Sequence, residues 1–156
     1  MNNMKNILKM AMMLLFVCSF TACSDDENIE PQPLEVTPNN ISGIWRLEEL
    51  NGEAIPEGTF CYIEYVRSDR TFTIYQKFDS MYPRCITGVY SIEKDPYKGY
   101  VLSGEYDYGM GEWNNDYIVT SLYETTMTLT ADNETGEISK YERCDEVPSD
   151  IIDSIK

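Results

Sequence analysis

The side chains in this sequence that could do chemistry are mainly carboxylates and thiols. The chain of 156 residues holds 27 acidic residues and five cysteines, and it has no histidine. Without histidine it lacks the usual general base and the usual zinc ligand. The carboxylates of Glu105 and Asp107 could serve a glycosidase, but such pairs are expected by chance among so many acids. No phosphate-binding glycine loop or serine-elbow motif occurs, so we predict that the protein is not an enzyme.

A calcium site is the other chemistry that the acids suggest. Asp107, Glu112 and Asp116 lie near one another in the sequence. Their spacing does not match an EF-hand loop, and acids occur along the whole chain. We therefore assign no metal ligand and no cofactor.

Cys23 has a more distinctive setting than any carboxylate. Lysines and a short apolar stretch, residues 10–17, precede it, and the polar residues 24–27 follow it. An apolar segment this short cannot span a bilayer of about 30 Å as a stable helix, and it is typical of a secretory signal that is removed. We predict a signal peptide over residues 1–22 and a mature chain that starts at Cys23.

Phe20-Thr21-Ala22, just before Cys23, resembles a bacterial lipobox, which implies a thioether-linked diacylglycerol and an acylated amino terminus that takes up palmitate. Two or three acyl chains hold a protein firmly, because each buried methylene contributes about 0.8 kcal/mol. The acidic run that follows resembles the export signal of lipoproteins of Bacteroides-type bacteria. This implies a lipid anchor in the outer membrane and a protein that faces the cell exterior. The alternative is an ordinary secreted protein with a cysteine near its cleavage site.

Charge and composition limit the partners and the domain organisation. The net charge is −15, which repels nucleic acid and leaves no basic patch, so nucleic acid is excluded as a partner. Residues 23–40 hold three prolines and several acids, and we expect an extended tether of about 50 Å at ~3.1 Å per residue. Residues 41–144 form one domain with a single core, and residues 145–156 form a C-terminal tail.

The domain is predicted to be all-β, because short runs of alternating apolar and polar residues are separated by turn residues. No segment shows sustained helical periodicity. The runs predict eight strands: Gly43 to Leu50, Thr59 to Arg67, Thr71 to Phe78, Arg84 to Glu93, Gly99 to Gly104, Glu112 to Ser121, Thr125 to Ala131, and Gly136 to Arg143.

The connections between these strands alternate between tight turns and longer loops. In an antiparallel up-and-down meander every second connection falls at the same end. The pattern therefore predicts an eight-stranded barrel with a closed floor at the tight-turn end and an open mouth at the long-loop end. The longer loops are residues 51–58, 79–83, 105–111 and 132–135.

Five short segments stand out by their order and spacing: Gly43 to Leu47, Asp69 to Phe72, Gly88 to Tyr90, Leu122 to Leu129, and Tyr141 to Arg143. Together they are similar to the lipocalin-like domain lipoproteins of Bacteroides-type bacteria. The resemblance covers most of residues 41–144, and it implies a barrel that binds a ligand at its mouth. Arg70 departs from the family, which usually has glycine after the aspartate.

Trp45 and Arg143 are expected to meet at the closed floor. In a closed barrel the first and last strands pair antiparallel, so the start of one lies beside the end of the other. A guanidinium stacked on an indole contributes about 0.5–2 kcal/mol and excludes water from the base. We assign both residues a structural role in closing the barrel.

If Trp45 points into the barrel, the alternation along the strands decides which other side chains point inward, and several of these end in a polar group. Eight strands enclose a space that side chains can just fill, or that can hold one small ligand. The polar tips then bond either to one another in a filled core or to a ligand in a hollow one. The set is Trp45, Leu47, Ile63, Tyr65, Phe72, Ile74, Gln76, Gly88, Tyr90, Ile92, Leu102, Ile118, Thr120, Met127, Leu129 and Tyr141.

The loops at the predicted mouth are rich in aromatic residues. Tyr82, Tyr108 and Trp113 are expected to be exposed there and to contact a ligand, together with the inward Tyr65, Gln76 and Tyr90. Alternatively, the loops fold over their own aromatics.

Two functional classes remain. The first is a lipid-tethered module that binds a small amphipathic or apolar ligand at the mouth. The second is an interaction or inhibitor protein with a solid barrel, whose loops engage a surface protein or glycan. Cys61, Cys85 and Cys144 are expected to be unpaired, since strands two and four are not neighbours and a disulfide cannot reach between them.

Overall fold

The structure is a computed structural model that describes residues 31–78 and 80–155. The predicted signal peptide, Cys23 and the first part of the predicted tether lie outside the described residues. In the described part, no helix has both the length and the apolar character needed to cross a membrane.

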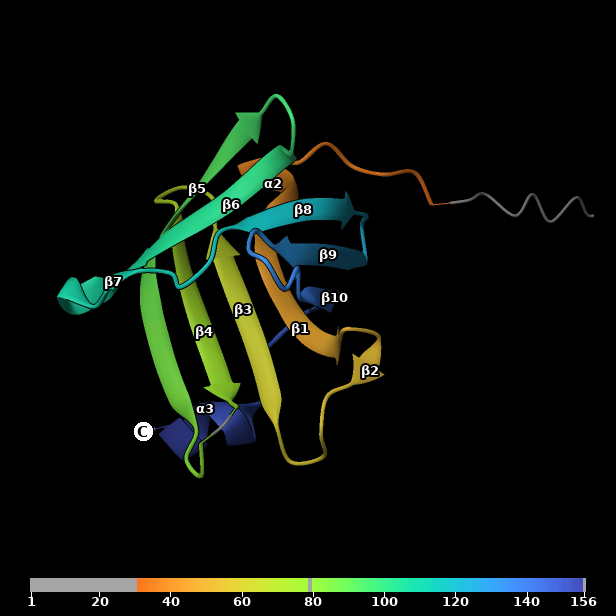
Figure 1. Cartoon of the computed structure of the whole chain (residues 1–156). Coiled ribbons are helices and arrows are strands. Elements are labelled where there is room, and N and C mark those ends of the chain that lie inside the picture. Colours follow the sequence, from red (N-terminus) through yellow and green to blue (C-terminus); the bar gives the residue numbers. More distant parts are fainter. Residues whose placement is uncertain (1–30, 79, 156) are drawn as a thin grey trace, which may run out of the picture. The chain divides into compact units, whose positions relative to one another are not determined.

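Within these residues, eight strands form a closed antiparallel barrel (Figure 1). Each strand pairs with the next one along the circuit, and pairing of the last strand with the first closes it. This confirms the predicted up-and-down barrel. The eight are β1 (Gly43–Leu50), β3 (Phe60–Val66), β4 (Thr71–Lys77), β5 (Arg84–Asp95), β6 (Gly99–Tyr106), β8 (Tyr117–Leu122), β9 (Thr126–Ala131) and β10 (Ile138–Cys144).

One predicted strand is wrong as a continuous element. The segment Glu112 to Ser121 is divided into a two-residue strand, β7 (Gly111–Glu112), and the barrel strand β8. β7 pairs back on β6, after the short 3₁₀ helix η1 (Asp107–Gly109). Residues 113–116 leave the ladder, and β8 meets β6 at only two residue pairs. A second short strand, β2 (Glu53–Ala54), pairs with the end of β1.

The predicted inward alternation holds on most strands but is wrong on β8. Ile118 is only partly buried and Thr120 is exposed, whereas Val119 and Leu122 are buried in the core. The register with β9 shifts between Val119 and Ser121. Such a bulge adds a residue to one strand, so that the alternation changes face along β8.

The floor is closed by Trp45 and Arg143, which are register partners across β1 and β10. The Arg143 guanidinium carbon lies 4.1 Å from the centroid of the indole ring. The same guanidinium donates hydrogen bonds to the carbonyl oxygens of Glu124, Ser42 and Asn40, at 2.7, 2.6 and 2.7 Å. Three backbone acceptors at a barrel end are satisfied by one side chain, an arrangement that the sequence does not indicate.

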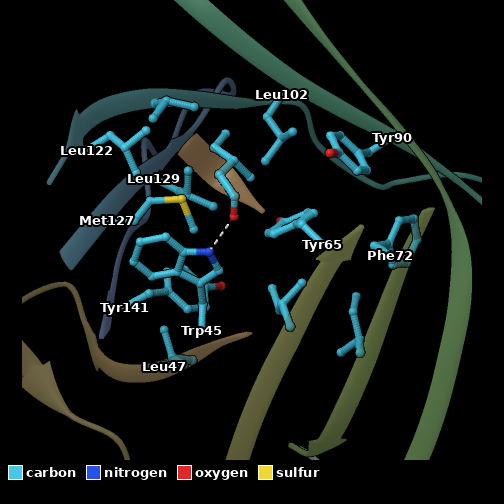
Figure 2. Packing of buried hydrophobic residues seen from close by; sticks show 14 of the residues in the cluster. Trp45, Leu47, Tyr65, Phe72, Tyr90, Leu102, Leu122, Met127, Leu129 and Tyr141 are labelled. Atoms are coloured by element: carbon cyan, nitrogen blue, oxygen red, sulfur yellow. Dashed lines mark hydrogen bonds between the residues drawn. The ribbon is translucent and has the colours of Figure 1, made fainter. Parts of the chain in front are cut away.

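Trp45 lies inside the core cluster and is fully buried (Figure 2). Its indole nitrogen donates to the carbonyl oxygen of Ile41 at 2.7 Å, the bond that is drawn as a dashed line. Met127 and Leu102 in the same cluster are also 0% exposed. The floor half of the barrel is therefore closely packed.

The packed part of the chain begins before residue 41. The Leu34 amide donates to the Leu122 carbonyl at 2.7 Å, and Val36 is buried in the core cluster. The short helix α2 (Pro38–Ile41) follows, with Thr37 as its N-cap, and Ile41 is 0% exposed. Residues 34–41 therefore lie against the floor instead of continuing as an extended tether.

The segment expected to be a C-terminal tail contains the helix α3 (Ser149–Ile155). Val147 and Ile151 pack with Tyr62, which points outward from β3, in a second apolar cluster. Ile44 and Tyr75 lie beside them. This helix explains why Tyr62 is buried although the alternation places it on the outer face.

Arg70, which stands where the resembling family usually has glycine, has φ = 55°. This is the left-handed region, which glycine enters at little cost and other residues enter at about 1–2 kcal/mol. Its carbonyl oxygen nevertheless accepts the Tyr90 amide at 2.7 Å. The turn thus keeps the conformation that suits glycine, and the barrel is unaffected.

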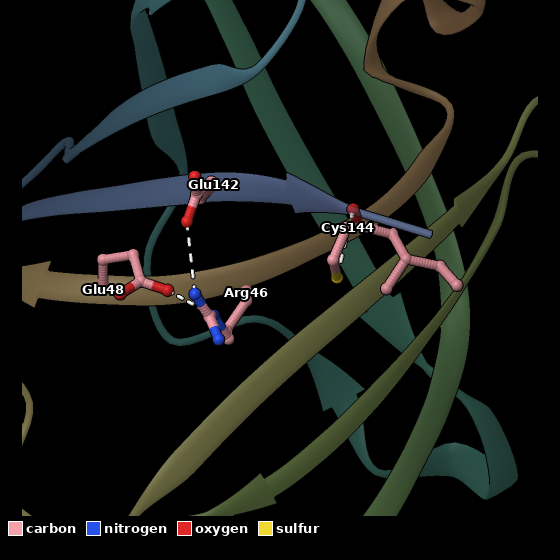
Figure 3. A network of polar contacts seen from close by, with 5 residues as sticks. Arg46, Glu48, Glu142 and Cys144 are labelled. Atoms are coloured by element: carbon pink, nitrogen blue, oxygen red, sulfur yellow. Dashed lines mark hydrogen bonds and ion pairs between the residues drawn. The ribbon is translucent and has the colours of Figure 1, made fainter. Parts of the chain in front are cut away.

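The outer face of the β1–β10 seam carries exposed ion pairs (Figure 3). Arg46 binds Glu48, and its Nη2 lies 3.2 Å from Glu142 Oε2. Lys140 pairs with Glu49 at 3.0 Å. Exposed pairs contribute about 0–1 kcal/mol each, so the seam depends mainly on its backbone ladder and on the floor contacts.

Candidate ligand-binding site

A cavity of about 200 Å³ lies inside the barrel, toward the end where the longer loops connect the strands. Its walls come from β3, β4, β6, β8, β9 and β10, together with the segment between β7 and β8. The lining residues are Cys61, Ile63, Tyr65, Ile74, Gln76, Tyr106, Trp113, Asn114, Asn115, Tyr117, Leu129 and Tyr141.

The deep wall follows from strand alternation. Successive side chains of a strand point to opposite faces, so Cys61, Ile63 and Tyr65 of β3 share the inner face. Ile74 and Gln76 of β4 do the same, and they pair in register with Ile63 and Cys61. Apolar side chains thus form the inner wall, with polar atoms at defined points on it.

Trp113 forms part of the rim, and Gly104 makes room for it. The Trp113 amide donates to the Gly104 carbonyl at 2.8 Å. A Cβ atom at position 104 would lie 2.2 Å from the indole ring, so only glycine allows the ring to rest on β6. The ring also packs edge-on against Phe72 and Tyr117, with centroid distances of 5.0 and 5.9 Å.

Two residues that line the cavity carry a buried hydrogen-bond donor with no partner among the described residues. These donors are the Tyr65 hydroxyl and the Trp113 indole nitrogen. Tyr65 is 1% exposed. The Tyr90 hydroxyl, which does not line this cavity, is a third buried polar atom without a partner in the described part of the chain. Buried polar groups in folded proteins are nearly always bonded, so these atoms are exceptions.

The cavity is electrically neutral, since none of the twelve residues that line it is acidic or basic. Burial raises the pKa of the Cys61 thiol to about 12. Burial also raises the pKa values of Tyr65 and Tyr141, followed in each case by the influence of neighbouring thiol and phenol groups. All three groups therefore remain protonated at neutral pH, and Cys61 is a poor nucleophile there.

Arg84 lies beside the site, next to Gln76 and Tyr106, and borders an adjoining hollow that shares both residues with the cavity. With the Gln76 amide oriented so that its oxygen faces the guanidinium, that oxygen accepts from Arg84 Nε and Nη2 at 2.9 and 2.8 Å. Arg84 does not itself line the cavity. The guanidinium therefore fixes the orientation of the amide and is the charged group nearest to the Gln76 side of the cavity.

The structure brings together three of the six ligand-binding residues expected from the sequence: Tyr65, Gln76 and Trp113. Tyr82 and Tyr108 do not line the cavity, and their side chains are 73% and 94% exposed. Tyr90 is buried, packs edge-on against Tyr65 with centroids 5.1 Å apart, and borders a separate hollow. Trp113 differs from the expectation of an exposed aromatic, because it is half-buried against Phe72.

Sequence reasoning missed several lining residues. Cys61 and Tyr106 fall on the inner face by simple alternation and could have been included. Asn114 and Asn115 lie where the chain leaves the ladder between β7 and β8. No periodicity marks such a segment, so the pattern could not have placed it.

The acids singled out from the sequence do not gather at this cavity. Asp107 Oδ2 accepts a hydrogen bond from Thr87 Oγ1 at 2.6 Å, which ties η1 to β5. Across residues 31–78 and 80–155, no group of three histidine, cysteine, aspartate or glutamate residues is arranged to hold a metal ion. Cys61, Cys85 and Cys144 are unpaired, as expected.

Known proteins resemble this chain in structure at low sequence identity. No protein-family model matches the chain, and no curated protein matches it. The crystal structure of a lipocalin-like protein from Bacteroides uniformis aligns with 67% of this chain and 99% of its own, with 15% sequence identity and a TM-score of 0.48. The assignment of the barrel rests on the strand pairing of this chain.

Proposed function

We propose that the barrel is a non-enzymatic binding module that takes one small amphipathic or apolar ligand in the cavity at its mouth. The observation that carries the proposal is the cavity of about 200 Å³, two of whose lining residues carry an unpartnered buried donor. An engineered apolar cavity of about 150 Å³ admits benzene. The space therefore suits one ring-sized molecule.

The contrast between the two halves of the barrel supports this proposal over a solid interaction protein. At the floor, the side chains of Trp45, Leu102 and Met127 are 0% exposed. The cavity is therefore not part of a generally loose interior.

Native mass spectrometry of the protein purified from its own organism tests the binding function. We expect an added mass that is lost in the variant Leu129→Phe, because the larger side chain fills the cavity from β9. Leu129→Met, which nearly conserves volume, should retain the added mass. Absence of any bound molecule in the unaltered protein, or equal retention by Leu129→Phe, would contradict binding in this cavity.

We further propose that the module is anchored in the outer membrane through lipid on Cys23 and faces the cell exterior. The support is the signal and lipobox pattern of the sequence. Replacement Cys23→Ala is expected to abolish incorporation of radiolabelled palmitate and to remove the protein from the membrane fraction. A Cys23→Ala protein that still takes up the label would show that the lipid is carried elsewhere.

A second candidate function is recognition of a surface protein or glycan by the mouth loops. It is favoured by four exposed apolar or aromatic side chains, Met81, Tyr82, Tyr108 and Met110, which are 59–94% exposed. Exposed side chains of this kind often mark contact surfaces. Unlike Trp113, they do not line the cavity, so substitutions can distinguish the two functions.

A further inference from the structure

We propose that the cavity selects a ring-sized ligand that is uncharged and carries a hydrogen-bond acceptor, such as a carbonyl or ether oxygen. This inference rests on the proposed binding function and names the chemical class of the ligand. Three features of the cavity lead to it: its volume, its unpartnered donors and its lack of charge.

The volume limits the ligand to about one substituted ring. At about 200 Å³ the cavity is somewhat larger than the engineered space of about 150 Å³ that takes benzene. It lies below the usual range of about 300–1,000 Å³ for pockets that hold drug-sized molecules. A long acyl chain would not fit, because Trp45, Leu102 and Met127 fill the barrel beneath.

The donors require acceptor atoms on the ligand. An indole N–H can only donate, so the Trp113 nitrogen is satisfied only by an acceptor. The Tyr65 hydroxyl, in a side chain that is 1% exposed, also lacks a partner among the described residues. Leaving a buried donor unsatisfied is unfavourable. A pure hydrocarbon would fill the space and leave both donors unsatisfied.

The residues that line the cavity carry no charge, which disfavours an ionic ligand. A buried ion needs a partner of opposite charge, and none of the lining residues supplies one. Tyr65, Tyr141 and Cys61 have raised pKa values and stay neutral. A carboxylate ligand would also meet a chain with a net charge of −15. These conditions favour a neutral molecule.

Three probes of nearly equal size separate these features: acetophenone, isopropylbenzene and benzoate. Titration calorimetry on the full chain carrying Cys23→Ala measures their binding without the lipid. We expect acetophenone to bind at least about tenfold more tightly than isopropylbenzene, as one or two added hydrogen bonds predict. Benzoate should show no measurable binding.

Two isosteric variants connect the preference to the named donors. Tyr65→Phe and Trp113→Phe should each reduce the preference for acetophenone by about threefold to tenfold, with little change in isopropylbenzene binding. Tyr97→Phe removes the same hydroxyl from a side chain that is 95% exposed at the β5–β6 turn, and it should change neither affinity. The retained preference of this control would exclude a general effect of losing a tyrosine hydroxyl.

The outcomes distinguish this inference from the proposed function. Equal binding of acetophenone and isopropylbenzene, unchanged by Tyr65→Phe, would overturn the acceptor requirement and leave the binding function standing. Tightest binding of benzoate would overturn the requirement for neutrality. If no probe binds, the donors hold ordered water and the inference is wrong, while the added mass in native mass spectrometry still decides the binding function.

Discussion

Replacement of Trp45 by alanine is expected to lower the free energy of unfolding by about 3–5 kcal/mol. The side chain is fully buried, its indole nitrogen bonds to the Ile41 carbonyl, and the Arg143 guanidinium lies over its ring. Small domains have a total stability of about 5–15 kcal/mol. In urea unfolding, the midpoint concentration of the variant should therefore lie far below that of the unaltered protein.

Arg143→Met provides the partner variant for a double-mutant cycle. It keeps an unbranched apolar stem but removes the hydrogen bonds to three carbonyl oxygens and the contact with Trp45. Its cost should be smaller than that of Trp45→Ala, and the double variant should lose less than the sum of the two. Additive losses would show that the two side chains do not stabilise the floor together.

The second large effect is expected at Trp113. Trp113→Ala should lower the free energy of unfolding by about 3 kcal/mol, because a large ring packed on Phe72 and Tyr117 is removed. Tyr82→Ala and Tyr108→Ala should each change it by less than about 0.5 kcal/mol, since both side chains are exposed. Thermal and urea unfolding of the three variants measure the difference.

Ligand binding should follow the same division. Trp113→Ala should abolish it, whereas Tyr82→Ala and Tyr108→Ala should leave it unchanged, because only Trp113 lines the cavity. Trp113→Phe is the matched control, which keeps a ring in place and should recover most of the lost stability. Loss of binding in Tyr82→Ala would contradict a site inside the barrel and would indicate that the mouth loops form the binding site.

Most of the barrel could be predicted from alternation alone. β1 has the same limits in the sequence and in the structure. Its inward residues Trp45 and Leu47 are buried, because a strand with one buried face must alternate. The meeting of Trp45 with Arg143 followed from the closure of the barrel, since closure places the start of the first strand beside the end of the last.

The features that could not be predicted depend on contacts between distant parts of the chain. Trp113 is half-buried because Gly104, on another strand, leaves room for its ring. Val119 and Leu122 are both buried although they are three residues apart, because a bulge shifts the register of β8 against β9 between them. Tyr62 is buried by a helix near the C-terminus that is too short to show periodicity.

The ladder between β6 and β8 has only two residue pairs, so the barrel is held together less strongly here than between its other strands. The other strand pairs around the circuit share longer ladders, so the circle can separate here with the fewest broken backbone bonds. Regions with few such bonds open locally at less cost than global unfolding. Because residues 113–116 adjoin this seam, a brief separation would lift the rim of the cavity while the floor stays closed. A ligand would then enter and leave the cavity between β6 and β8, through the side of the barrel.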